Sequence, residues 1–295
     1  MADYPFALAL GYITGLSDKK KATIALSSEE VEDATALKRV VKAVDPLFLV
    51  KKEEIEDAYL QSVKNIESHL NQGIDCVTFW DADYPELLKE IADAPLILYY
   101  RGNIAALNSS PCVAVVGTRE PTDFGREMSL LAGQVLAGSG YTVVSGLARG
   151  CDTAAHQGCI SERGKTVAFI GHGLQMIYPP ENGDLALEII NTGGCVVSEY
   201  PLGTKLSPSN LKHRNRLQSG TSLATLIIET DLKSGTMKTA EYARSQGRKL
   251  FVLNHPTENK SPMSEGNQKL ISEGYARSIE PEEIETLGDK VVEEV

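Results

Sequence analysis

The sequence has no long hydrophobic run and little cysteine. Its apolar stretches, such as residues 113–116, are short, and none approaches the roughly 20 residues that span a membrane. The N-terminus lacks the basic region and the small-residue cleavage site of a signal peptide. The five cysteines form no C-x-x-C pair, which argues against a disulfide framework or a zinc site. We therefore expect a cytoplasmic protein without membrane contact.

The standard motifs of several enzyme classes are also missing. G-x-G-x-x-G does not follow the first expected parallel strand, which weakens an NAD(P)-binding interpretation, and the absence of G-x-x-x-x-G-K-[ST] disfavours P-loop ATP hydrolysis. No H-E-x-x-H motif, paired metal ligands or G-x-S-x-G elbow occurs. We therefore expect no cofactor, no metal site and no catalytic residue.

The net charge of −11 is unevenly distributed. Residues 1–100 carry 10 Lys and Arg against 18 Asp and Glu, and residues 256–295 carry 4 against 10. Residues 101–255 carry 15 against 12 and are mildly basic. Because anion binding depends on local cations rather than on total charge, the acidic flanks do not exclude a phosphate ligand in the central part.

Residues 1–70 have the apolar spacing of amphipathic helices. Apolar side chains recur at i, i+3 and i+4 from Val31 to Val44 and again from Ile55 to Leu70. Ser27 or Ser28, followed by glutamates, marks a helix start. We predict a small helical module over residues 1–70.

From residue 112 onward, short runs rich in Val and Ile alternate with helical patterns, as in βαβ units with a parallel sheet. This predicts an α/β, doubly wound, mostly parallel sheet of extended Rossmann-like type over residues 71–280, followed by an acidic C-terminal tail over residues 281–295. The expected strands are 112–116, 141–145, 166–170, 194–198, 223–228 and 249–253, and the expected helices lie near 124–138, 152–163, 181–191, 210–219 and 236–246.

Ligands of parallel sheets bind beyond the carboxyl ends of the strands, where helix N-termini direct their N–H groups outward. Glycine-rich turns and cations follow these strand ends, and together they predict an elongated phosphate-binding rim that suits a polymer backbone better than one small cofactor. The candidate residues are Gly117, Thr118, Arg119, Ser145, Gly146, Arg149, Gly150, Gly171, Gly173, Lys212, Arg214, Asn215, Arg216, Lys233, Ser234, Gly235 and Thr236.

Four neighbouring residues have simpler structural interpretations. Asp152 stands where a helix N-cap belongs, and His156, one turn later, is expected to be packed rather than catalytic. We interpret Tyr178, beside two prolines, as a loop anchor. Glu199 at the end of the fourth strand is expected to orient an arginine.

The order of motifs resembles the DprA/Smf family of DNA-processing proteins. The matching motifs are V-x-V-V-G-T-R, S-G-L-A-R-G-x-D-x-x-A-H, G-H-G-L-x-x-x-Y-P-x-x-N, S-E-Y-P, R-N-R, E-T-x-x-x-S-G-T-x-x-T-A-x-x-A and L-F-V-L, with Gly266-Asn267 further on. The resemblance covers about residues 75–280. It implies an extended Rossmann domain, often preceded by a sterile-alpha-motif-like module, and a non-enzymatic protein that binds single-stranded DNA, forms homodimers and loads the RecA recombinase in natural transformation.

By that resemblance Arg119, residues 145–150, the run from Arg214 to Arg216 and residues 234–236 would line the DNA groove, whereas Lys212 and Lys233 are chosen by charge alone. The chain departs from the family in three places, one of which is Leu253-Asn254, where Pro-Gly is usual. The Phe-Pro that usually precedes R-N-R is missing, which removes an aromatic that would contact a base. We also expect this protein to lack the C-terminal winged-helix domain of many members.

Two other functions remain open at this point. One is a nucleotide-processing enzyme like the Rossmann-type phosphoribohydrolases, which use P-G-G-x-G-T-x-x-E. Here Thr239 takes the position of that glutamate, and Glu241 is out of register by about half a helical turn. The other is a small-nucleotide sensor.

Overall fold

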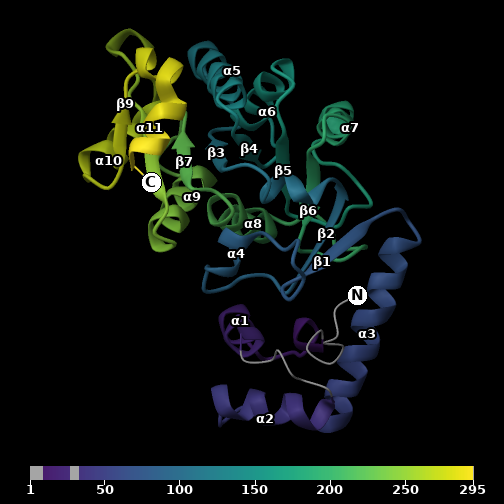
Figure 1. Ribbon diagram of the computed structural model, residues 1–295. Coiled ribbons are helices and arrows are strands. Elements are labelled where there is room, and N and C mark those ends of the chain that lie inside the picture. The colour runs from purple at the N-terminus through teal and green to yellow at the C-terminus, as the bar shows by residue number, and fades with distance from the viewer. Residues whose placement is uncertain (1–8, 27–32, 295) are drawn as a thin grey trace.

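The computed structural model describes residues 9–26 and 33–294, and its N-terminal part is helical as predicted (Figure 1). The expected helix start at Ser27 or Ser28 lies outside the described residues. Helix α2 is capped instead by Asp33, whose carboxylate accepts a hydrogen bond from the Ala36 N–H at 2.8 Å. The helices of this module are α1 (Asp18–Leu26), α2 (Ala34–Val44) and α3 (Lys52–Leu70).

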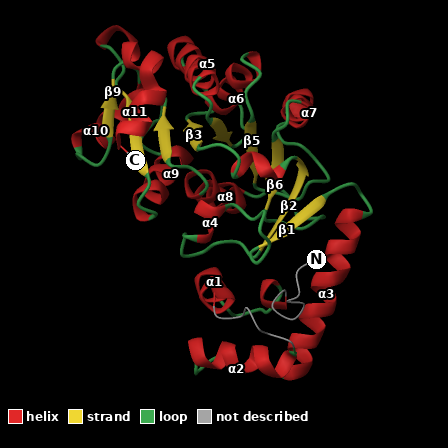
Figure 2. Ribbon diagram, in the orientation of Figure 1, coloured by secondary structure: helices red, strands yellow, loops and turns green. Residues whose placement is uncertain are grey.

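The rest of the chain forms a nine-stranded sheet in the order β1-β2-β6-β5-β4-β3-β7-β8-β9 (Figure 2). The pairings from β6 through β8 are parallel, as predicted, and β9 extends them in parallel, whereas β1 and β2 add an antiparallel end. The strands are β1 (Asp75–Thr78), β2 (Ile97–Gly102), β3 (Cys112–Val116), β4 (Thr142–Ser145), β5 (Thr166–Ile170), β6 (Cys195–Ser198), β7 (Ala224–Ile227), β8 (Lys249–Leu253) and β9 (Arg277–Ile279).

Helices cover both faces of this sheet, which makes it a doubly wound, Rossmann-like fold. One face packs against α5 and α6, and the opposite face packs against α8, α9 and α10. The helices after the first module are α4 (Glu86–Lys89), α5 (Asp123–Gly138), α6 (Cys151–Ser161), α7 (Gly183–Asn191), α8 (Pro208–Gly220), α9 (Gly235–Ser245), α10 (Glu265–Ser272) and α11 (Leu287–Glu294).

The strand order contains a topological switch point at β3. The chain runs from β3 outward through β4, β5 and β6, and then returns to place β7 on the other side of β3. Loops from the two halves therefore diverge beyond the carboxyl ends of β3 and β7, and such a divergence is where open α/β sheets bind their ligands.

The helical module is packed on the sheet domain rather than tethered to it. Buried side chains of the module, such as Leu37 and Ile55, belong to the same apolar core as Leu98 of β2. The His69 ring stacks on Tyr99 with a centroid separation of 3.8 Å, and the His69 Nε2 accepts a hydrogen bond from the Leu202 N–H at 2.9 Å. The predicted boundary near residue 70 is thus a change of architecture within one continuous core.

Residues 281–294 do not form the predicted tail. They form a 3₁₀ helix (Pro281–Thr286) and α11, and both pack on α5. Ile284, Leu287 and Val291 are buried, and the Tyr141 hydroxyl donates a hydrogen bond to the Gly288 carbonyl at 2.9 Å. Their spacing of three and four residues is that of an amphipathic helix, which the surrounding acidic residues concealed.

We expect Leu287→Ala to lower the free energy of unfolding by about 2–5 kcal/mol, because it removes a fully buried side chain and leaves a cavity. Val292 of the same helix is 70% exposed, so Val292→Ala should change stability by less than about 0.5 kcal/mol. Urea denaturation at neutral pH would measure both. Equal, small effects would mean that α11 is not part of the core.

Candidate functional site

A cavity of about 410 Å³ opens at the switch point. We call it the switch-point pocket. Its walls come from the loops after β3, β4 and β7, together with one side of α8 and Met263. The lining residues used below are Gly117, Thr118, Arg119, Glu120, Ala148, Asp152, Leu211, Lys212, Arg214, Asn215, Ser234, Gly235, Thr236 and Thr239.

The first turn of α9 forms one side of this pocket. Ser234 caps the helix, because its hydroxyl accepts a hydrogen bond from the Thr236 N–H at 3.1 Å. The Thr236 hydroxyl donates to the Gly117 carbonyl at 3.0 Å, which joins the loops after β3 and β7. The Asn215 amide donates to the Gly235 carbonyl at 3.2 Å. A helix N-terminus held in this way favours a negatively charged ligand.

Two exposed cations, Arg119 and Lys212, line the same pocket. Within residues 9–26 and 33–294, neither of them makes an ion pair, so their charges are available to a ligand. Lys233 is exposed as well, but it is not among the lining residues. The structure thus brings Gly117, Thr118, Arg119, Lys212, Arg214, Asn215 and residues 234–236 of the predicted set together.

A smaller cavity of about 200 Å³ adjoins the first, and we call it the side pocket. Arg119, Glu120, Ala148, Leu211 and Arg214 line both cavities. The further lining residues are Gly146, Arg149, Tyr178 and Pro179. The two cavities therefore form one groove along the strand ends, in keeping with the elongated rim that the sequence predicts.

Arg149 lies at the side pocket, but its charge is partly compensated. Its guanidinium forms an exposed ion pair with Glu181, and the hydrogen bond to that carboxylate raises the pKa of Arg149 above its usual value. It is therefore a weaker candidate for a free anion contact than Arg119.

Arg214 lies beneath the floor of both cavities and is fully buried. Its Nη1 donates hydrogen bonds to the carbonyls of Gly146, at 2.8 Å, and Phe169. Burial lowers the pKa of this guanidinium to about 10, although the charge of Asp152 acts in the opposite direction. Arg214 thus remains a cation at neutral pH and places a positive charge under the groove.

Arg216 does not line the groove. Two positions along a helix differ by about 200° in direction, so Arg214 and Arg216 project to different sides of α8. Arg216 is 1% exposed and is paired with Glu199 at 2.6 Å and with Asp93 at 3.1 Å. The prediction that Glu199 orients an arginine is confirmed, and Arg216 has a structural role away from the predicted interface.

Several predicted glycines are required by the packing and backbone conformation of the loops. A Cβ on Gly146 would lie 2.4 Å from the Arg214 guanidinium, and Gly150 has φ +76°. Both positions therefore exclude larger residues for structural reasons. Ser145, Gly150, Gly171 and Gly173 line neither cavity.

Asp152 and His156 both face inward. Asp152 follows the helix N-cap, which is Gly150, and its carboxylate accepts hydrogen bonds from the Gly146 N–H at 3.1 Å and the Ala148 N–H at 3.4 Å. It therefore supports the loop after β4 rather than capping α6 as predicted. His156 is packed, as expected, with its Nδ1 2.6 Å from the Thr166 hydroxyl.

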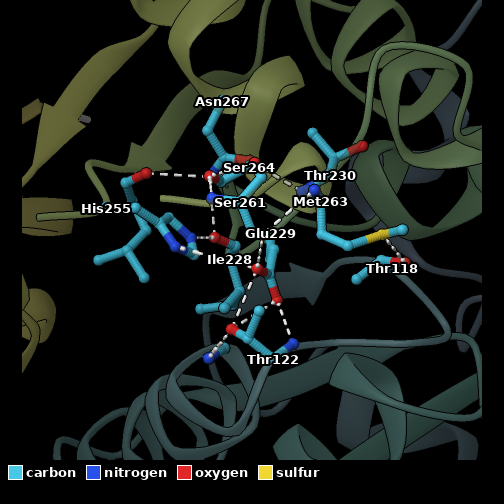
Figure 3. Close-up of polar contacts among 12 residues, drawn as sticks. Thr118, Thr122, Ile228, Glu229, Thr230, His255, Ser261, Met263, Ser264 and Asn267 are labelled. Carbon is cyan, nitrogen blue, oxygen red and sulfur yellow. Dashed lines mark hydrogen bonds and ion pairs between the residues drawn. The ribbon is translucent and has the colours of Figure 1, made fainter. Parts of the chain in front are cut away.

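Glu229 is a positioning residue that the sequence pattern did not reveal. Its buried carboxylate accepts hydrogen bonds from the Thr122 N–H at 2.8 Å and the Thr122 hydroxyl at 3.1 Å, and its backbone carbonyl accepts from the Thr118 N–H at 2.7 Å (Figure 3). These bonds fix both ends of the loop that carries Arg119. The only sequence signal was the position of Glu229, directly beyond the fifth parallel strand.

Met263, in the segment after β8, lines the switch-point pocket, and Figure 3 shows it beside Thr118. The Thr118 hydroxyl lies 3.9 Å from the Met263 sulfur. Asn267 holds this part in place, because its amide donates to the carbonyls of Ile228 at 2.8 Å and Leu253 at 2.9 Å, and its carbonyl oxygen accepts from the Thr230 N–H at 2.8 Å. Sequence-distant elements thus meet around Arg119.

The described ranges hold no group of three or more His, Cys, Asp or Glu side chains placed to bind a metal ion. Nor does any helix in them combine the length and apolar character needed to cross a membrane.

Fold and site together define a Rossmann-like α/β protein with a groove lined by cationic side chains at its switch point. Residues 75–289 match the family model of DNA recombination-mediator protein A, and the chain belongs to this family. It is 43% identical to Protein Smf of Synechocystis sp. over 191 residues, which cover 64% of this chain and 48% of that protein. The chain spans about half the length of the first curated relatives it matches.

Two solved structures of the family are similar to this one. The X-ray structure of DNA processing protein A from Streptococcus pneumoniae has a TM-score of 0.76 at 28% identity and covers 95% of both chains. A structure of DNA processing protein A from Helicobacter pylori, described by its single-stranded DNA binding mode, has a TM-score of 0.65 at 28% identity, covering 74% of this chain and 96% of that one.

The Arg216–Glu199 pair predicts how stability depends on pH. Burial raises the pKa of Glu199, but the charge of Arg216 and the hydrogen bonds from His213 and Arg216 outweigh it and hold this pKa at about 2, below the ordinary 4.5. A carboxyl group with a lowered pKa stabilises the fold above its unfolded-state value and loses that contribution as pH falls through its folded-state value. The ionised Glu199 carboxylate, with its partners Arg216 and His213, should therefore contribute about 3 kcal/mol at pH 7 and progressively less from pH 4.5 down to pH 2.

We expect Glu199→Gln to lower stability at pH 7, with the difference from the wild type narrowing toward pH 2 in urea denaturation. Glu181→Gln is the matched control, since it removes an exposed carboxylate that also pairs with an arginine, and it should leave stability nearly unchanged. A difference between Glu199→Gln and the wild type that is constant with pH would contradict this account.

Proposed function

We propose that this protein binds single-stranded DNA along the groove formed by the switch-point pocket and the side pocket. The observation that carries the proposal is the convergence of the α9 N-terminus with Arg119, Lys212 and the buried Arg214 at the carboxyl edge of the sheet. Backbone phosphates would lie against these groups, with Thr118 and Asn215 available as neutral hydrogen-bonding partners. The related Helicobacter pylori protein, whose structure is described by its single-stranded DNA binding mode, supports this choice of ligand.

A polymer fits this groove better than a single small cofactor. The groove extends past the switch-point pocket into a second cavity, and cationic side chains lie along it rather than around one point. Successive phosphates of one strand would contact Lys212 in the switch-point pocket, Arg119 at the junction of the two cavities and Arg149 in the side pocket. The ligand would therefore be held mainly by electrostatic attraction.

A role in loading a RecA-type recombinase onto that strand, and a homodimeric assembly, extend this proposal. Both are supported by membership of a recombination-mediator family and by the resemblance of the motifs. The five unpaired cysteines fit a cytoplasmic site of action.

We propose that the protein is not an enzyme. In the enzyme alternative, an acid would follow the α9 glycine turn and face the substrate. Here Thr239 takes that lining position, whereas Glu241 is exposed and paired with Lys238 at 2.6 Å. The residue that would have to carry the chemistry is therefore turned away from the pocket.

We expect the logarithm of the binding constant for a single-stranded oligonucleotide to fall linearly with the logarithm of the salt concentration. The reason is that each phosphate bound by a cation releases its counterions. Arg119→Ala should weaken binding by about 10-fold or more and reduce the salt slope by about one. Fluorescence anisotropy with single- and double-stranded oligonucleotides would measure both quantities.

Arg39→Ala is the matched control, because Arg39 is an exposed arginine on α2, outside both cavities. It should bind like the wild type. Salt-independent binding, or equal effects of the two substitutions, would refute the proposed groove. Release of free base from nucleoside monophosphates in a parallel turnover assay would instead favour the enzyme.

A further inference from the structure

The side pocket differs in chemistry from the switch-point pocket beside it. Tyr178, Pro179 and Leu211 give it an apolar wall, and Tyr178 is half-buried with part of its ring accessible. Within the described residues, the Tyr178 hydroxyl makes no hydrogen bond, so no polar contact requires a tyrosine here. An accessible ring of this kind is a surface on which another flat ring can stack.

The loop that carries Tyr178 is firmly held. Pro179 is buried, and the Asn182 amide donates hydrogen bonds to the Leu147 carbonyl and the Thr153 hydroxyl, both at 2.9 Å. The ion pair between Arg149 and Glu181 adds a second attachment to the loop after β4. The ring is therefore presented at a fixed place, which reduces the entropy lost when a ligand stacks on it.

Continuity with the switch-point pocket indicates what would stack there. Arg119 and Arg214 line both cavities, so a phosphate held by Arg119 lies at the junction of the two. In a single strand each phosphate is followed by a nucleotide whose base projects from the backbone. A volume of about 200 Å³ is smaller than the roughly 300–1,000 Å³ of pockets for drug-sized ligands, and it suits one ring system.

We propose that the side pocket is a nucleobase subsite in which the Tyr178 ring stacks on one base of the bound strand. This inference rests on the proposed function, since it needs a strand whose phosphate lies at Arg119. Stacking uses the ring face that all bases share, so this subsite should accept every base rather than select one.

Helix α8 offers the groove no Phe, Tyr or Trp ring on which a base could stack. The three residues before Arg214 are Leu211, Lys212 and His213. Leu211 lines the pocket without a ring, and His213 points elsewhere, 3.5 Å from Glu199 and 3.7 Å from Asp18. Among the described residues that line the two cavities, Tyr178 is the one with a Phe, Tyr or Trp ring.

The test compares a natural oligonucleotide with one of equal length and charge whose central positions are abasic. We expect the wild type to bind the abasic strand about 5- to 150-fold more weakly, which is the range for losing one stacked base. Tyr178→Phe should behave like the wild type. Tyr178→Leu, which keeps apolar volume but lacks a ring, should bind both strands with the same low affinity and an unchanged salt slope.

Tyr275→Ala is the matched control, because Tyr275 is an exposed tyrosine outside both cavities, where it lies under Arg244. It should bind both oligonucleotides like the wild type. The subsite is refuted if Tyr178→Leu still discriminates between the two strands as the wild type does, or if it loses equal affinity for both. If neither oligonucleotide binds at all, the proposed function fails together with the subsite. If substitution of Tyr178 has no effect on binding while Arg119→Ala weakens it, the subsite alone is refuted.

Discussion

Two buried guanidinium groups attach α8 to the sheet, and the groove depends on that attachment. Burying a charged group is unfavourable unless it finds partners. Arg216 finds two carboxylates, Glu199 and Asp93. Arg214 finds two backbone carbonyls at the ends of neighbouring parallel strands, while its Nε has no hydrogen-bonding partner among the described residues. Arg216 is thus neutralised by carboxylates away from the groove, whereas Arg214, which is bonded to backbone carbonyls, lines both cavities.

This arrangement explains how a protein of net charge −11 can offer a site for a polyanion. Attraction for a bound phosphate comes from charges within a few ångströms, because salt screens those beyond a Debye length of about 8–10 Å. Arg119 and Lys212 at the surface, Arg214 beneath it and the α9 N-terminus all lie at the walls of one cavity. Many acidic groups of the flanks pair with local cations, as Glu294 does with Arg277 at 2.7 Å.

The sheet could be predicted closely from the sequence, and the directions of single side chains could not. Strands buried on both faces read as continuous apolar runs, so β3, β5 and β8 have the predicted bounds. The R-N-R run correctly predicted positive charge at the carboxyl edge of the sheet. Whether each arginine faces the groove or a carboxylate, however, depends on the rotation of α8 about its axis. The contribution of Glu229 was equally hidden, because its partner Thr122 lies 107 positions away.

Contacts between distant parts of the chain link the site to the stability of its surroundings. Thr118 and Glu229 connect the loop after β3 to the segment from Ser261 to Met263, through contacts of 3.9 Å and 3.5 Å that are longer than strong hydrogen bonds. A ligand that binds only the assembled groove stabilises every contact needed to assemble it. A ligand held at Arg119 would therefore also stabilise the segment from Ser261 to Met263, of which Met263 lines the pocket. Because Glu229 already fixes the loop that carries Arg119, the ligand would lose less free energy in ordering that loop.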